Sequence, residues 1–285
     1  MRPIDAKTKV CAVFGHPVGH SLSPEMHNAA FAALKLPFVY VAHDVEPGSL
    51  SRAMEGGRAM GYRGLSITIP HKVAALECVD DVDETARSIG CINTVVNDDG
   101  RLHGTNSDGL GALDALRDAG ADPEGSRTLV LGSGGAARAI AVTISRKAPP
   151  ERISLLGIDE EELGLLASDI QQRGLSHVTS APLTPETLRA ELEVADILLH
   201  CSPVGMHPRE DQSLVPPEWL HEGVTVFDAV YNPRRTKLIR DAENAGCKTI
   251  LGLEMFLGQA FVQFELWTGE KAPRRVMREI VEEKL

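Results

Sequence analysis

The chain has 285 residues, of which 43% are apolar and 24% are charged, and its net charge is −11. This length is enough for two ordinary domains with hydrophobic cores, and the composition is typical of a globular protein rather than a disordered or fibrous one. The negative charge excludes a surface that attracts DNA, RNA or an anionic membrane, so we expect no nucleic-acid and no membrane partner.

The first half of the chain alternates short apolar segments with helical patterns, which is typical of the α/β class. Ser23 has the residue type of a helix N-cap, and Pro24 suits the first helical position. Gly120 follows the later helix as a stop signal. The expected strands are 9–14, 39–43, 64–69 and 92–96, and the expected helices are 24–35 and 110–119.

The second half repeats the same alternation, so we expect a second α/β series there. A polar, turn-forming segment at 121–127 precedes it, and a largely helical segment from 254 to 285 follows it. The strands of this series are predicted at 128–131, 153–156, 195–200, 224–230 and, as a short one, 249–251.

A glycine-rich turn, GSGGAA at 132–137, directly follows the predicted strand at 128–131 and opens a helix. Glycines in this position allow a tight strand-to-helix turn and close approach of the backbone to a pyrophosphate. The phosphates then lie at the positive end of the helix. The turn therefore predicts a dinucleotide site, and the alternative is a glycine-rich turn without a ligand.

The next predicted strand ends in Gly157, Ile158 and Asp159, where a dinucleotide fold contacts the adenosine ribose. An acidic residue there accepts hydrogen bonds from the ribose of NAD and repels the 2′-phosphate of NADP. No Lys or Arg occurs between Ile153 and Gln172. Asp159 is therefore our candidate for the ribose contact, and the alternative is an acidic helix N-terminus favoured by the helix dipole.

Ser21 and Ser23 follow the first predicted strand and precede a helix. Two hydroxyls at a helix N-terminus can hold a carboxylate without a positive charge. The alternative for Ser23 is that it only caps the helix. His16, His20 and His27 lie nearby, but their spacing matches no zinc pattern, so we expect no metal.

Three further polar motifs follow strand ends in the first half: SITIPHK at 66–72, INT at 92–94 and GTNSDG at 104–109. The carboxyl ends of strands in an open α/β sheet are where ligands bind. A lysine and an aspartate can act there as a proton donor and the group that orients it, which makes Lys72 and Asp108 candidates. Taken singly, each residue also fits a surface salt bridge or a turn.

Together these motifs resemble those of the shikimate dehydrogenase family, including its quinate/shikimate branch. The resemblance extends over nearly the whole chain and covers, in order, FGHPVGHSLSPEMHN, GLSITIPHK, GCINTVV, GTNSDG, GSGGAA, CSPVGM, DAVYNP and GLEMFLGQA. It implies an N-terminal α/β substrate domain (1–108), completed by C-terminal helices (253–285), and a Rossmann-like dinucleotide domain (109–252). The family places its active site in the cleft between these domains.

The resemblance also implies roles for individual residues. Lys72 and Asp108 match the catalytic pair. Ser21 and Ser23 match the serines that hold the substrate carboxylate, with Tyr231 close by. The remaining implied contacts are Ser66, Thr68, Asn93 and Gln259 for the ring hydroxyls, Gly132, Ser133, Gly134, Gly135, Ala136 and Ala137 for the dinucleotide, and Ala229 and Gly252 for the nicotinamide.

Four departures from the family pattern stand out. Ser66 replaces the usual Asn of the G-x-N-V-T-x-P-x-K motif, and N-T-D-G reads N-S-D-G at 106–109. The Asn-Arg-Thr cluster that grips the NADP 2′-phosphate is replaced by residues 157–159, which favours NAD with NADP as the alternative. His200, Cys201 and Ser202 replace the usual Asn-Ala-Thr, a change whose consequence the sequence does not reveal.

The implied function is the reversible reduction of 3-dehydroshikimate to shikimate with a nicotinamide cofactor, in the shikimate pathway of aromatic amino acid biosynthesis. Four alternatives are a quinate dehydrogenase that prefers NAD, a catalytically silent relative that senses quinate, an aminoshikimate dehydrogenase and a methylenetetrahydrofolate dehydrogenase. The Ser-x-Ser motif at 21–23 argues against the folate enzyme.

We expect a cytoplasmic protein. Its five cysteines are scattered and form no C-x-x-C pair, and the sequence shows no apolar leader and no membrane-spanning segment. We expect it to be a monomer or homodimer.

Overall fold

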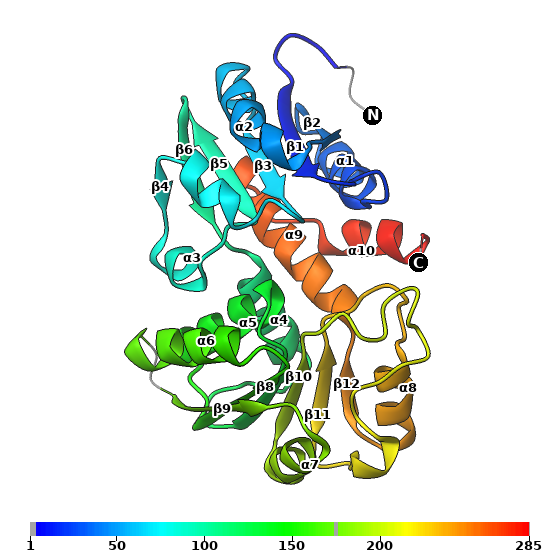
Figure 1. The fold of residues 1–285 in the computed structure, drawn as a ribbon. Coiled ribbons are helices and arrows are strands. Elements are labelled where there is room, and N and C mark those ends of the chain that lie inside the picture. The colour runs from blue at the N-terminus through cyan, green and yellow to red at the C-terminus, as the bar shows by residue number, and fades with distance from the viewer. Residues whose placement is uncertain (1–3, 174–175, 285) are drawn as a thin grey trace. The chain divides into compact units, whose positions relative to one another are not determined.

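The structure is a computed structural model that describes residues 4–173 and 176–284. The chain divides into two compact units, each built on its own six-stranded sheet (Figure 1). The first unit contains the residues up to Ser107 and those from Gln259 onward, and the second contains Asp108–Gly258. The chain returns from the second unit to the first within helix α9 (Gly252–Thr268).

The sheet of the first unit is mixed, with the strand order β2-β1-β3-β5-β6-β4. Strand β1 pairs in parallel with β2 and β3, whereas β5 is antiparallel to both β3 and β6, and β4 pairs in parallel with β6 at the edge. The strands are β1 (Lys9–Gly15), β2 (Phe38–Asp44), β3 (Gly64–Ile67), β4 (Asp81–Val82), β5 (Thr94–Asp98) and β6 (Arg101–Thr105).

Two hydrophobic clusters hold the helices of the first unit to this sheet. One contains Phe14, Met54 and Leu65 and lies beneath α2. The other is aromatic, and in it Phe31 of α1 packs on Phe264 of α9 with ring centroids 5.4 Å apart. The helical elements are α1 (Ser23–Ala33), η1 (Pro47–Ser49), α2 (Leu50–Ala59), η2 (Ala74–Cys78), α3 (Glu84–Ile89), the last part of α9, and α10 (Arg274–Glu282).

Trp267 fastens α9 to the first sheet. Its indole Nε1–H donates a hydrogen bond to the carbonyl oxygen of Val95 at 3.0 Å. The ring lies over Gly64 so closely that a Cβ on that residue would be 2.1 Å from the indole nitrogen. Glycine at position 64 is therefore required for this helix to approach the sheet.

The sheet of the second unit is entirely parallel, with the order β12-β11-β10-β7-β8-β9. The strand order reverses between β7 and β10, as in doubly wound dinucleotide-binding folds, and ligands bind at the carboxyl ends of the strands at such a point. The strands are β7 (Arg127–Leu131), β8 (Arg152–Gly157), β9 (His177–Pro182), β10 (Ile197–His200), β11 (Thr225–Asp228) and β12 (Lys248–Ile250).

The second unit alternates these strands with helices. Leu129, Leu131 and Leu198 of the sheet form a buried cluster with Leu192 of α7 and Leu238 of α8. Helices α4, α5 and α6 lie together in the ribbon (Figure 1). The helical elements are α4 (Asp108–Asp118), α5 (Gly135–Lys147), α6 (Glu160–Arg173), α7 (Pro185–Val194), η3 (Pro217–Trp219) and α8 (Lys237–Asn244), followed by the start of α9.

The structure confirms the α/β class and the two-part architecture that the sequence predicted. Every predicted strand is present with shifted ends, whereas β4, β6 and β9 were not predicted. The predicted helical segment 254–285 contains α9 and α10, and Leu285 lies outside the described residues. Across 4–173 and 176–284, every helix is too short or too polar to span a lipid bilayer.

Candidate active site

The glycine-rich turn joins β7 to α5 as the sequence predicted. Gly132 has a φ of +118°, a conformation that side chains disfavour, and a Cβ there would lie 3.1 Å from the carbonyl oxygen of Cys201. Gly134 and Gly135 are exposed, and a Cβ on either would meet nothing within 4 Å. The backbone N–H groups of the first turn of α5 are therefore accessible, and such groups form an anion site at a helix N-terminus.

The segment after β8 combines a helix cap with a cluster of acidic residues. The Asp159 carboxylate accepts a hydrogen bond from the backbone N–H of Glu162 at 2.9 Å, so it caps α6. Ser133 of the glycine turn donates to the Glu162 carboxylate at 2.8 Å. Ile158 is 93% exposed. The structure thus shows the acidic helix N-terminus of the alternative interpretation, with Asp159 as its cap, and a ribose contact by the same side chain stays a prediction.

The sequence HCS at 200–202 forms a buried polar relay at the carboxyl ends of β10 and β11. His200 Nδ1 lies 2.8 Å from Asp228 Oδ1, and His200 Nε2 lies 2.6 Å from Ser202 Oγ. Asp228 also accepts hydrogen bonds from Val230 N at 3.0 Å and from Thr236 Oγ1 at 2.5 Å. Where the family usually has Asn-Ala-Thr, this chain therefore has a histidine whose two ring nitrogens both have hydrogen-bond partners.

The residues predicted to approach the nicotinamide come together within the second unit. A Cβ on Gly252 would lie 2.5 Å from the carbonyl oxygen of Val230 and 2.8 Å from the carbonyl carbon of Ala229, so the backbones are in direct contact. Tyr231 stacks on Phe256 with ring centroids 5.0 Å apart. The Ala229 N–H donates to the carbonyl of His200 at 2.9 Å, which links this pair to the relay.

In the first unit, Asn93 is the centre of a buried hydrogen-bond network. Its Oδ1 accepts hydrogen bonds from Thr94 Oγ1 at 2.7 Å, from Ser107 N at 2.8 Å and from Ser107 Oγ at 3.1 Å. These bonds fix the orientation of the amide group. The motifs at 92–94 and 104–109, which are separate in the sequence, therefore meet next to Asp108.

Ser66 belongs to the same network through two residues that sequence reasoning missed. Tyr40 Oη donates to Ser66 Oγ at 2.7 Å, and Ser66 Oγ donates to Gln263 Oε1 at 2.9 Å. Gln263 Nε2 in turn donates to Thr94 Oγ1 at 3.0 Å. Because Ser66 donates its hydroxyl proton to Gln263, its oxygen can only accept a hydrogen bond from a ligand.

One sequence signal could have found Gln263: it lies four residues after Gln259 on α9, so the two amides share a helix face. Tyr40 is an ordinary strand aromatic in the sequence, and only its burial reveals its role. Burial raises the pKa of Tyr40, and this outweighs the lowering by hydrogen bonds with Ser66 and Ser23. The phenol therefore stays protonated and can donate.

Ser21 and Ser23 lie at the start of α1; the predicted N-cap role of Ser23 is wrong, and the carboxylate contact of the two serines stays a prediction. Ser23 is not the N-cap; it is the first helical residue, and Leu22 occupies the cap position without a side-chain hydrogen bond. The Ser21 hydroxyl accepts the Ser23 N–H at 3.3 Å instead. The Ser23 hydroxyl is near enough to Tyr40 to contribute to lowering the pKa of the phenol, which connects the serine pair to the network around Ser66.

Lys72 and Asp108 belong to different units. Lys72 follows β3, and its carbonyl oxygen accepts a hydrogen bond from Ile92 N at 3.0 Å, which ties it to the Asn93 motif. Thr68 of the same segment donates its N–H to the carbonyl of Phe14 at 3.0 Å. Asp108 is the first residue of α4 and only 9% exposed. The pairing of the two side chains stays a prediction, as do the ligand contacts of Thr68 and Gln259.

The described residues contain no group of three or more His, Cys, Asp or Glu side chains arranged to hold a metal ion. His27 is completely buried between aromatic rings, and His16 pairs with Asp44 at 2.7 Å. All five cysteines are free thiols.

Comparison with known proteins decides the family. Residues 13–95 match the family described as the shikimate dehydrogenase substrate binding domain, and residues 252–282 match the shikimate 5′-dehydrogenase C-terminal domain. A shikimate dehydrogenase (NADP(+)) of Moorella thermoacetica is 43% identical over 285 residues, which cover 100% of this chain and 96% of that protein. The chain belongs to the shikimate dehydrogenase family.

Solved structures of this family have the same fold. Shikimate 5-dehydrogenase of Listeria monocytogenes, in complex with shikimate and NAD, aligns with a TM-score of 0.94 at 35% identity and covers 99% of both chains. A quinate dehydrogenase of Corynebacterium glutamicum in complex with NAD aligns with a TM-score of 0.88 at 26% identity, over 97% of this chain and 99% of that one. The resemblance inferred from the sequence motifs is confirmed.

Proposed function

We propose that this chain is a shikimate dehydrogenase, an oxidoreductase that reversibly reduces the ketone of 3-dehydroshikimate to the alcohol of shikimate with a nicotinamide dinucleotide. The observation that carries this proposal is the 43% identity to a shikimate dehydrogenase over the whole chain. Its place is then the shikimate pathway, which leads to the aromatic amino acids.

The first unit supplies the groups that a carboxylated ring with several hydroxyls requires. Ser21 and Ser23 hold the carboxylate by hydrogen bonds at the start of α1. Thr68, Asn93 and Gln259 bind the ring hydroxyls. Ser66 acts as an acceptor, and the second unit adds Tyr231, which the proposal assigns to the carboxylate. Residues 1–108 and 253–285 therefore form the substrate domain, and 109–252 the dinucleotide domain.

The second unit fits a dinucleotide. The N–H groups at the start of α5, where Gly134 and Gly135 are exposed, would hold the pyrophosphate, and the backbones at Ala229 and Gly252 would approach the nicotinamide. When bound, the nicotinamide supplies or accepts the hydride.

During reduction, negative charge develops on the ketone oxygen, and Lys72 donates the proton that neutralises it. Asp108 orients the ammonium of Lys72 and shares its proton.

NAD is the preferred cofactor in this proposal. The region beyond β8 carries Glu160, Glu161 and Glu162 in the first turn of α6 in addition to Asp159, and an exposed Ile158 replaces the arginine usual in the family. A 2′-phosphate placed there would face carboxylates without a compensating cation from 153 to 172. The relatives differ in the cofactor named with them, NADP(+) in Moorella and NAD in Listeria.

The cofactor proposal is tested by the ratio of kcat/KM for NAD⁺ to that for NADP⁺ with shikimate. We expect a ratio above one, and we expect the double variant Ile158→Arg/Asp159→Thr to lower it by about tenfold or more, equivalent to about 1.4 kcal/mol. Glu193→Ala, which removes an exposed carboxylate on α7, is the matched control and leaves the ratio unchanged. A wild-type preference for NADP⁺ contradicts the proposal.

The substrate proposal is tested by initial rates with shikimate and with quinate, each with NAD⁺ and NADP⁺. Quinate carries an extra ring hydroxyl, and a site with fixed polar groups discriminates steeply against a hydroxyl that it cannot pair. We expect a higher kcat/KM for shikimate. A higher value for quinate assigns the chain to the quinate alternative, and ligand binding without turnover of either substrate assigns it to the silent, sensing alternative.

We further propose that the enzyme works in the cytoplasm as a monomer or homodimer. Five free thiols, of which Cys11 and Cys247 are buried, suit a reducing compartment. Size-exclusion chromatography with light scattering measures the oligomeric state, and a species larger than a dimer contradicts this part of the proposal.

A further inference from the structure

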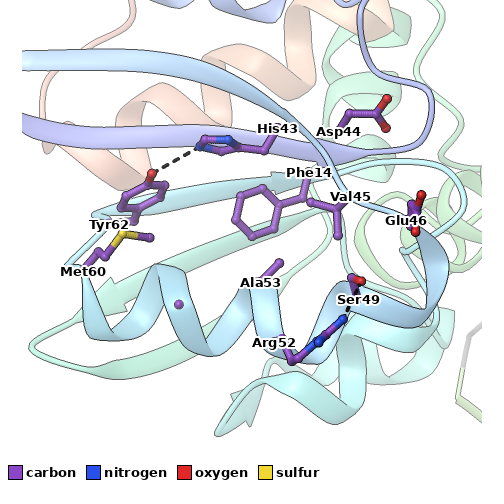
Figure 2. A pocket seen from close by; sticks show the side chains of 11 residues that line it. Phe14, His43, Asp44, Val45, Glu46, Ser49, Arg52, Ala53, Met60 and Tyr62 are labelled. Carbon is purple, nitrogen blue, oxygen red and sulfur yellow. Dashed lines mark hydrogen bonds between the residues drawn. The ribbon is translucent and has the colours of Figure 1, made fainter.

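The first unit contains a pocket of about 580 Å³, and none of the residues that line it is proposed to bind substrate or cofactor. This volume lies in the range of small-molecule sites, about 300–1,000 Å³. The pocket is formed by β1, the end of β2 and the following turn, η1 and α2 (Figure 2). Its lining residues are Phe14, His43, Asp44, Val45, Glu46, Ser49, Arg52, Ala53, Gly56, Met60 and Tyr62.

One end of the pocket is aromatic. The rings of Phe14 and His43 meet edge to face with centroids 5.6 Å apart, and His43 stacks on Tyr62 at 6.0 Å. A hydrogen bond of 3.2 Å between His43 Nε2 and Tyr62 Oη holds these two rings together. Met60 adds a side chain that is 67% exposed. Such a surface suits a flat apolar group, because aromatic rings and a thioether pack well against one.

The other end of the pocket carries charges that do not neutralise each other (Figure 2). Arg52 donates to Ser49 Oγ at 3.1 Å, and within the described part of the chain it forms no ion pair. The Glu46 carboxylate likewise has no hydrogen-bond or ion-pair partner among the described residues. Asp44, by contrast, is paired with His16 at 2.7 Å. A guanidinium and a carboxylate thus face the same pocket, each available to a ligand of opposite charge.

We propose that this pocket binds a free α-amino acid with an aromatic side chain. The ligand carboxylate binds Arg52 and Ser49, its ammonium binds Glu46, and its ring packs on His43 and Tyr62. A purely cationic ligand would leave Arg52 unpaired, and a purely anionic one would leave Glu46 unpaired. A zwitterion with an apolar ring uses both ends of the pocket.

The pocket owes part of its room to Gly56 on α2. A Cβ on this residue would approach no atom more closely than Met60 Cε, at 3.9 Å. A larger side chain at position 56 can therefore extend into the pocket without displacing the backbone of α2. This residue offers a way to fill the site while its charged and aromatic side chains are kept.

The pocket wall is bonded to the segment that carries Lys72. The Phe14 carbonyl accepts the Thr68 N–H at 3.0 Å, and the Val45 carbonyl lies 2.6 Å from His71 Nε2. A ligand that shifts Phe14 or Val45 is therefore expected to change kcat/KM. This effect on turnover rests on the proposed function, whereas binding itself does not.

Isothermal titration calorimetry of the full chain with L-phenylalanine tests the proposal. We expect saturable binding of one ligand, and binding at least about tenfold weaker for phenethylamine, 3-phenylpropionate and L-alanine, each of which lacks one recognised group. Gly56→Leu is expected to abolish binding. Gly164→Leu is the matched control on α6, where a Cβ meets nothing within 4 Å, and it retains the wild-type affinity.

Arg52→Gln and Glu46→Gln separate the two charged contacts, and each is expected to weaken L-phenylalanine at least about tenfold. The thermal unfolding curve of Gly56→Leu shows whether this variant folds. If it does not, Arg52→Gln and Glu46→Gln still test the proposal, because both changes are on the surface. Absence of saturable heat at millimolar L-phenylalanine overturns the proposal. So does equal affinity for phenethylamine, or unchanged affinity in a folded Gly56→Leu variant.

Discussion

At the scale of single residues, two buried histidines differ in whether their ring nitrogens have hydrogen-bond partners. His200 has partners for both ring nitrogens, Asp228 and Ser202. His27 is completely buried and lies between aromatic rings, with Tyr40 stacked on it at 4.6 Å, and neither of its ring nitrogens has a hydrogen-bond partner among the described residues. Since water and partners are both excluded, the charged form of His27 is strongly disfavoured.

The stability of the protein is expected to depend on pH through His27. Burial lowers its pKa from 6.5 to about 3, so below pH 6.5 the unfolded chain binds a proton that the folded chain does not. The free energy of unfolding therefore falls as the pH decreases from 6.5 towards 3, by up to about 1.4 kcal/mol per pH unit from this group. Denaturant unfolding at several pH values measures the slope.

His27→Phe isolates this contribution because it keeps an aromatic ring and removes the titration. Its free energy of unfolding should fall less steeply than that of the wild type over the same pH range. Equal slopes for the two proteins would show that His27 becomes protonated in the folded state.

Asp228 is predicted to be a major contributor to the stability of the second unit. It is fully buried and bonded to His200, Val230 N and Thr236. Asp228→Ala leaves these donors unpaired, and breaking a buried pair in this way costs about 3–5 kcal/mol. Asp211→Ala, at an exposed position, should change stability by less than about 0.5 kcal/mol. A loss below about 1 kcal/mol for Asp228→Ala would contradict the role given to the relay.

At the scale of elements, the close packing of α4 on α5 depends on Gly109. A Cβ there would lie 2.0 Å from Thr143 Oγ1 and 2.4 Å from the carbonyl oxygen of Ala139, and the second of these atoms is backbone that cannot rotate away. Glycine therefore sets the distance between the two helices, one of which begins at Asp108 and the other at Gly135 within the glycine turn.

Gly109→Ala is expected to destabilise the protein by about 1–3 kcal/mol, because the added methyl forces the helices apart. The same exchange at Gly164 of α6, where a Cβ meets nothing, should instead stabilise by about 0.5–1 kcal/mol. Thermal and denaturant unfolding of both variants gives the comparison. An unchanged free energy of unfolding in Gly109→Ala would show that α4 and α5 tolerate a wider separation.

The elements that were predicted correctly are those with strong apolar patterns. Strands β1, β7 and β8 are nearly continuous apolar runs, and the glycine turn after β7 has a motif of its own. In β6 and β9 the pattern is weak, because in β9 only Val178 is buried, and in β6 the buried positions are Leu102 and Gly104. These strands depend on pairing with their neighbours, which the local sequence does not encode.

Across the whole molecule, the ordered motifs predicted the family, and the structure supplied the connections between them. The Asn93 and Ser107 contact, the Tyr40–Ser66–Gln263 chain and the relay around His200 each join segments that lie far apart in the sequence. Tyr40 could not be identified beforehand, since it is an ordinary strand aromatic in the sequence, whereas the spacing of Gln263 from Gln259 on α9 was a signal that was not used. The helix-cap role of Ser23 was predicted wrongly, because the helix begins one residue earlier than expected, with Ser23 as its first residue and Leu22 at the cap position.

The proposed chemistry depends on Lys72, which donates the proton to the ketone oxygen during reduction and takes it up again during oxidation. Lys72→Ala should lower kcat for shikimate oxidation by about 10²–10⁴ and change the dissociation constant of shikimate little. Lys7→Ala, at an exposed position of the same unit, is the control and should behave as wild type. A steady-state measurement of kcat for Lys72→Ala decides the matter: a loss of that size is the predicted result, and a wild-type kcat would contradict the mechanism.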